Sequence, residues 1–102
     1  MELKEICKRI CDFSSSESKK IDSPMAYVRV RVGKDFLFGD EEFQQAFHDA
    51  KWDTEISSAD IDIIRDDSFL GFLKIEELTG FFDEDGKCAV IRTDGEGSQI
   101  AL

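Results

Sequence analysis

Two acid-x-Lys triplets form the shortest pattern in this chain that is typical of catalysis, Asp49-Ala50-Lys51 and Asp85-Gly86-Lys87. Metal-dependent nucleases use carboxylates to hold Mg²⁺ and a lysine to support the attacking water. Two further acids would complete one set, which comprises Asp66, Asp67, Asp85 and Lys87. A chain this rich in charge contains such triplets by chance. We therefore expect no catalytic residue and keep a metal-dependent nuclease as the second alternative function.

Metal binding is the other chemistry that the cysteine, histidine and acidic residues suggest. Cys7 and Cys11 are four residues apart, and a soft metal would need a further ligand such as His48 or Cys88. Both cysteines lie on an apolar helix face, where a free cysteine acts as a small hydrophobe. The acidic turn at 83–86 and the loop at 93–97 lack the twelve-residue spacing of calcium loops. We expect no metal, no cofactor, and a surface or half-buried His48 that is not a general base.

The acidic residues are concentrated in one part of the chain. Residues 35–67 hold eleven acidic side chains against Lys51 and Arg65, while residues 1–34 hold eight basic and five acidic ones. The whole chain carries a net charge of −10. Nucleic acids and anionic lipids need basic partners, so the acidic part is not expected to bind them directly. A basic protein is the expected partner.

The predicted elements place these acids on one helix and one strand. Phe43, Ala46, Phe47 and Ala50 follow helical spacing and predict a helix over 41–51, with Asp40 as its cap. Between 56 and 65, Ile61 and Ile63 alternate with acids and predict a strand. The expected partner-binding residues are Asp40, Glu41, Glu42, Asp49, Asp53, Asp60, Asp62, Asp66 and Asp67.

The remaining patterns predict one small α+β domain over residues 1–102. Its mostly antiparallel sheet of about four to five strands is expected to pack with two to three helices. The alternation of Val28, Val30 and Val32 predicts a strand over 25–32, which opens a hairpin over 26–38 whose short loop uses Gly33 for an unusual φ. We also predict a helix at 2–13, an exposed loop at 14–24, a strand at 69–74, a helix at 75–81, a strand at 87–92 and a loop at 93–98. The final QIAL segment either pairs at a sheet edge or frays.

No targeting or membrane segment is expected. The first residues alternate charged and apolar side chains, and no apolar run exceeds four residues, far short of the ~20 that a membrane span needs. The odd cysteine count predicts reduced thiols, which is typical of a cytoplasmic protein.

A small, acidic, cofactor-free protein fits an immunity protein or antitoxin that covers a basic nuclease toxin. Six aromatic residues lie among the acids: Phe36, Phe38, Phe43, Phe47, Trp52 and Phe69. They are expected either to anchor an interface or to form the core. Trp52, just past the predicted helix, is expected to close the core. The first alternative is a DNA mimic that inhibits a host defence nuclease, as anti-CRISPR and anti-restriction proteins do. A third interpretation is that the charge only keeps the protein soluble.

Overall fold

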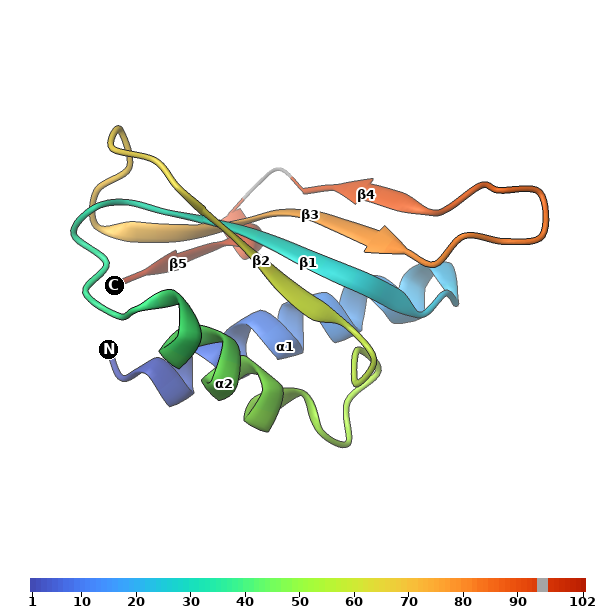
Figure 1. Cartoon of the computed structure of the whole chain (residues 1–102), viewed down its shortest axis with the longest axis horizontal. Coiled ribbons are helices and arrows are strands. Elements are labelled where there is room, and N and C mark those ends of the chain that lie inside the picture. Colours follow the sequence, from blue (N-terminus) through green and yellow to red (C-terminus); the bar gives the residue numbers. More distant parts are fainter. Residues whose placement is uncertain (94–95) are drawn as a thin grey trace.

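The structure is a computed structural model of the whole chain, and it describes residues 1–93 and 96–102. Figure 1 shows the helices below a twisted sheet, with both chain termini at the same end. The elements in chain order are α1 (Leu3–Ile21), β1 (Met25–Val32), α2 (Asp40–Lys51), β2 (Asp60–Arg65), β3 (Phe72–Gly80), β4 (Val90–Arg92), a 3-10 turn (Glu96–Ser98) and β5 (Gln99–Ala101).

Strand β1 lies inside the sheet, whose order is β2-β1-β3-β4. It pairs in parallel with β2 and antiparallel with β3. Parallel neighbours need a long crossover connection, and here the crossover contains α2. Both β4 and β5 pair antiparallel with β3, at residues 77–79 and 72–74 respectively. The α+β class and the small single domain predicted from the sequence are confirmed, although the sheet is partly parallel.

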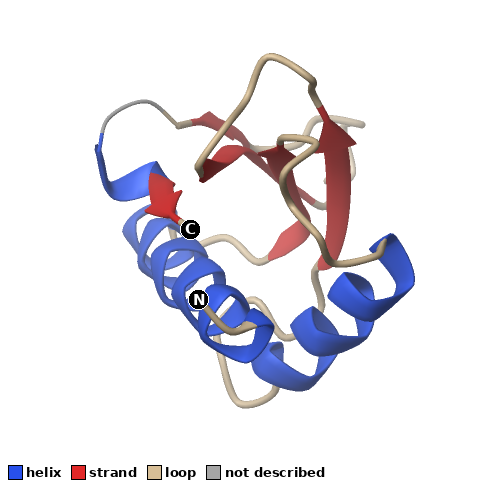
Figure 2. Cartoon of the chain, turned by 90° about the vertical axis from the view of Figure 1, so that its left-hand side faces the viewer, coloured by secondary structure: helices blue, strands red, loops and turns tan. Residues whose placement is uncertain are grey.

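Both helices cover the same face of the sheet, as the turned view in Figure 2 shows. The apolar alternation of β1 places Val28, Val30 and Val32 on this face, where they are fully buried. Phe43 and Phe47 of α2 belong to the same core. The core also contains Ile6, Cys7, Ile10, Cys11, Met25, Phe36, Ile56, Ala59, Ile61, Leu73, Ile75, Leu78 and Ile100. Within the part of the chain that the structure describes, no helix covers the other face of the sheet (Figure 2), which we call the open face.

The exposed loop predicted at 14–24 is wrong, because α1 continues to Ile21. Ser14 and Ser18 follow Cys7 and Cys11 at helical spacing and are buried on the same face. The hydroxyl of Ser18 donates a hydrogen bond to the carbonyl of Ser23 at 2.7 Å. A search for apolar periodicity misses this half of the helix because its buried face consists of serine.

The hairpin predicted over 26–38 is also wrong. β1 ends at Val32, and its partners are β2 and β3. The helix predicted at 75–81 is instead the second half of β3, which is continuous over Phe72–Gly80. The register of β3 with β1 shifts between Arg29 and Val30, so that Glu76 has no residue of β1 directly opposite it. Such a bulge breaks the strict alternation by which strands are detected.

Three further predicted elements are confirmed, whereas the strand predicted at 69–74 begins only at Phe72. The helix at 41–51 is α2, the strand within 56–65 is β2, and β4 lies within 87–92. The QIAL segment pairs at the sheet as β5. The expected loop at 93–98 contains residues 94–95, which lie outside the described residues, and a 3-10 turn follows them.

Gly33 is required by a close backbone approach and not by the unusual φ that the expected hairpin implied. A Cβ atom at this position would lie 1.8 Å from the carbonyl oxygen of Phe69. We predict that Gly33→Ala lowers the free energy of unfolding by about 1–3 kcal/mol, because the backbone must move to accept the methyl group. Urea denaturation measures this change.

Gly97→Ala is the matched control. Its added methyl group would meet the Phe13 ring at 3.5 Å, an ordinary contact distance. This control should change stability by about 0.5 kcal/mol or less. Equal stability of Gly33→Ala and the unsubstituted chain would contradict the close approach.

Candidate functional site

The outer side of β2 is a free sheet edge. The amide of Asp66 donates to the carbonyl of Val32 at 2.8 Å. Because backbone groups alternate along a strand, the N–H and C=O of Ile61 and Ile63 point away from β1. Within the described chain, no hydrogen bond uses these outward groups. Such an edge is a template on which another chain can pair.

A groove of about 470 Å³ lies between α2 and this edge. The exposed side chains of α2 that line it recur at helical spacing, and Ile61 and Asp60 of β2 line its other side. The lining residues are Glu41, Gln44, Gln45, Phe47, His48, Lys51, Asp60 and Ile61. The groove therefore presents both hydrogen-bond donors and acceptors beside free backbone groups.

Lys51 gives the groove a buried cation. Only 7% of Lys51 is exposed, and its Nζ donates to the carbonyl of Ala59 at 2.7 Å. The carboxylate of Asp60 lies 4.0 Å from the same nitrogen. An ammonium group has three donors, so the Ala59 carbonyl satisfies only part of its capacity.

Trp52 stands at the end of α2 and is 61% exposed. Its ring meets His48 edge-on at 5.3 Å between centroids. The expectation that Trp52 closes the core is wrong, since the chain leaves the helix there with Trp52 extended and Asp53 at φ 63°. Phe36, Phe43 and Phe47 fill the core, and His48 is exposed.

The structure brings only two of the nine expected acids into this groove, Glu41 and Asp60. Asp40 lies at the start of α2 and pairs with Arg65 at 2.8 Å, without capping the helix. Asp49 lies on another side of α2, lines a second groove with α1, and accepts a hydrogen bond from Gln45. Of the nine expected acids, Glu42, Asp53 and Asp67 are also exposed and lie away from the groove.

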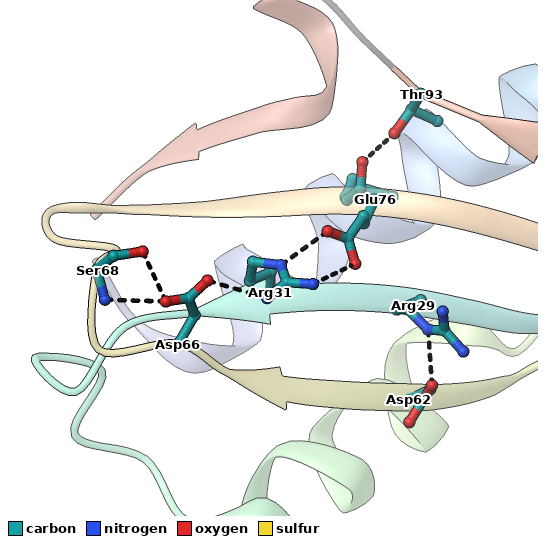
Figure 3. Close-up of polar contacts among 8 residues, drawn as sticks. Arg29, Arg31, Asp62, Asp66, Ser68, Glu76 and Thr93 are labelled. Carbon is teal, nitrogen blue, oxygen red and sulfur yellow. Dashed lines mark hydrogen bonds and ion pairs between the residues drawn. The ribbon is translucent and has the colours of Figure 1, made fainter.

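Asp62 and Asp66 are engaged in ion pairs on the open face of the sheet (Figure 3). Arg29 Nε donates to Asp62 at 2.9 Å, and the register continues this row to Glu77 and Arg92. Arg31 donates twice to Glu76, at 2.7 and 3.2 Å, and once to Asp66 at 2.9 Å. Acids and bases therefore alternate across the strands and neutralise one another.

Among the acids that pair with Arg29 and Arg31, Asp66 accepts the most hydrogen bonds. It accepts bonds from the amide and hydroxyl of Ser68, at 2.9 and 2.6 Å, and from Arg31. These hydrogen bonds hold the pKa of Asp66 below its ordinary value, and those from Ser68 have the largest effect.

The residues of the expected nuclease set lie at opposite ends of the sheet. Asp66 and Asp67 follow β2, whereas Asp85 and Lys87 lie in the connection from β3 to β4 that projects to the right in Figure 1. There the carboxylate of Asp83 accepts bonds from the amides of Asp85 and Lys87, as in a polar turn. Among the described residues, no three His, Cys, Asp or Glu side chains form a group that could hold a metal ion.

Cys7 and Cys11 belong to the core, as expected. Burial is the main cause that raises the pKa of Cys7 to about 12, and the neighbouring Cys11 is the second cause. Burial is also the main cause that raises the pKa of Cys11 to about 11. Both thiols therefore stay protonated at neutral pH and are poor nucleophiles and metal ligands.

No protein-family model matches this chain, and no match was found among curated proteins. The solution structure of the Ni metallochaperone HypA from Helicobacter pylori has a similar fold, with a TM-score of 0.57 and 17% sequence identity. The alignment covers 100% of this chain and 94% of that one. The likeness shows the fold alone. No helix among the described residues is long and apolar enough to cross a membrane.

The function expected from the charge pattern is wrong. The similar fold is that of a metallochaperone and not of a toxin inhibitor, which overturns the immunity protein or antitoxin. The DNA mimic needs one continuous acidic face, but the acids are dispersed and several are paired with arginine. The metal-dependent nuclease is rejected because the structure does not bring Asp66 and Asp67 near Asp85 and Lys87.

We predict that Asp66 stabilises the fold near neutral pH and that this contribution disappears in acid. Its folded-state pKa is lowered, so its stabilisation is present above the unfolded pKa, about 3.9, and is lost as pH falls through the folded value. Urea denaturation of the original chain and of Asp66→Asn should show a difference at pH 7 that narrows below about pH 4. A difference independent of pH would contradict this assignment.

Proposed function

We propose that this chain is a non-enzymatic protein-binding domain and that its binding surface is the α2–β2 surface. This surface comprises the outer edge of β2, the groove beside it and Trp52 at the end of α2. The observation that carries the proposal is the free backbone edge of β2 lying directly beside a groove. Protein partners use exposed strand edges and adjoining grooves in this way.

Trp52 supports a binding role because exposed tryptophan is the residue type most enriched among the strongest contacts of protein interfaces. The edge-on contact with His48 restrains its ring beside the groove. Three free cysteines support a cytoplasmic location as part of the same proposal.

The proposal is tested with a random peptide library displayed on phage and selected against the immobilised full-length chain. Selected peptides should lose about tenfold or more in affinity for Trp52→Ser, because the substitution removes a large exposed contact. Fluorescence anisotropy with the synthetic peptides measures the affinities.

Phe82→Ser is the matched control, since Phe82 is 76% exposed but lies in the connection between β3 and β4. It should leave the affinities unchanged, and circular dichroism checks that both variants fold. Peptides that depend on Phe82 and ignore Trp52 would move the binding surface elsewhere.

Metal delivery is a second candidate function, which the likeness to a Ni metallochaperone supports. The described side chains contain no group of three potential ligands, so this candidate rests on the fold alone. Equilibrium dialysis against Ni²⁺ separates the two candidates. We expect the chain to bind far less than one Ni²⁺ ion per molecule at micromolar Ni²⁺, on the order of a tenth or below, with no rise in Tm. Uptake of one ion with a rise in Tm would favour metal delivery.

A further inference from the structure

We infer that the α2–β2 surface takes an extended basic segment of a partner protein, which pairs with the outer edge of β2 as an added strand. This inference rests on the proposed function and specifies the partner's conformation and chemistry. It follows from the direction of the backbone groups, from the position of the groove and from the charges on each side of β2.

The backbone of β2 can bond a strand on its free side without losing its pairing with β1. Asp60, Asp62 and Ile64 direct their backbone groups toward β1, as the bond from Asp66 to Val32 requires. Ile61 and Ile63 direct theirs outward at a spacing of two residues. An extended chain presents its own donors and acceptors at the same spacing.

The groove leaves room for side chains of the added strand that point toward the helices. On that side β2 presents Ile61 and the half-buried Ile63, and α2 presents Gln44 and His48. Lys51 adds donors at the same place. Side chains with an aliphatic part and a hydrogen-bonding group fit these neighbours.

The open-face side of β2 favours basic side chains. In the register, Asp60 and Asp62 lie beside Tyr27 and Arg29 of β1, and Asp62 already pairs with Arg29 at 2.9 Å. The side chain of Asp60 at the edge is 77% exposed, and its carboxylate is only loosely paired, with Lys51 Nζ 4.0 Å away at the groove. Oppositely charged side chains on adjacent strands stabilise the pairing, so Lys or Arg should occupy alternate positions of the segment. The net charge of −10 further attracts such a partner.

A second copy of this chain fits the edge poorly. A symmetric antiparallel pair of β2 strands centred on Asp62 would place one Asp62 directly against the other. Like charges opposite each other on adjacent strands are destabilising. The whole-chain charge of −10 adds a further repulsion.

The test uses an eight-residue peptide in which Thr alternates with Lys, labelled with fluorescein at its N-terminus and amidated at its C-terminus. We expect it to bind the full-length chain, with an affinity that falls as salt rises. A peptide with Glu in place of Lys should not bind. Asp60→Lys should lower the affinity about tenfold. Asp49→Lys, with the same net charge but on the other side of α2, should change it less than about twofold.

Backbone N-methylation tests the strand pairing itself. One peptide carries N-methyl groups on its two central Lys residues, and another on two central Thr residues. Only one set of amides can face β2, so one peptide should lose about tenfold or more in affinity while the other retains it. Sensitivity of the Lys set would indicate a strand parallel to β2, and sensitivity of the Thr set an antiparallel one.

Equal effects of both methylated peptides, or equal effects of Asp60→Lys and Asp49→Lys, would overturn the inference. So would a dimer in analytical ultracentrifugation that the peptide does not dissociate, because a second copy would then occupy the edge. Library peptides that depend on Trp52 but tolerate both methylations would retain the proposed function without the added strand. Library peptides that ignore Trp52 would remove the proposed function itself.

Discussion

The rest of the structure depends on β1, whose backbone is paired on both sides and whose three buried valines hold both helices on one face. Its parallel partner β2 is reached through α2 and becomes the outermost strand on that side. The far side of β3 is taken by β4 and β5. The outer side of β2 is thus left free beside the helix that leads into it, which places the groove and the free edge together.

The open face of the sheet explains why a net charge of −10 does not produce one acidic surface. Arg29 and Arg31 of the central strand reach acids on both neighbouring strands. Arg65 neutralises Asp40 near the start of α2. Glu41 and Asp60 remain at the groove, with Lys51 held below them by a carbonyl group. Binding at this surface therefore depends on a few carboxylates and on backbone direction more than on total charge.

Local patterns sufficed where a single element buries one regular apolar face. The valines of β1 and the phenylalanines of α2 repeat at the periods of a strand and a helix. The method failed where the buried face is polar or irregular. Serines continue the buried face of α1, and a bulge interrupts the alternation of β3. Gly33 suggested a tight turn, but the reason for glycine there is a carbonyl group from a residue far along the chain.

The sequence by itself determined the α+β class, the course of β1 and α2, the buried cysteines and the side of β2 that carries its acids, because each follows from side-chain periodicity within one segment. Only the tertiary structure decided the strand order, the free edge of β2, the exposure of Trp52 and the pairing of the acids. Asp62 and Glu76 meet arginines that are 33 and 45 residues away in the chain. Such contacts depend on how the strands are ordered, and no local pattern records that order.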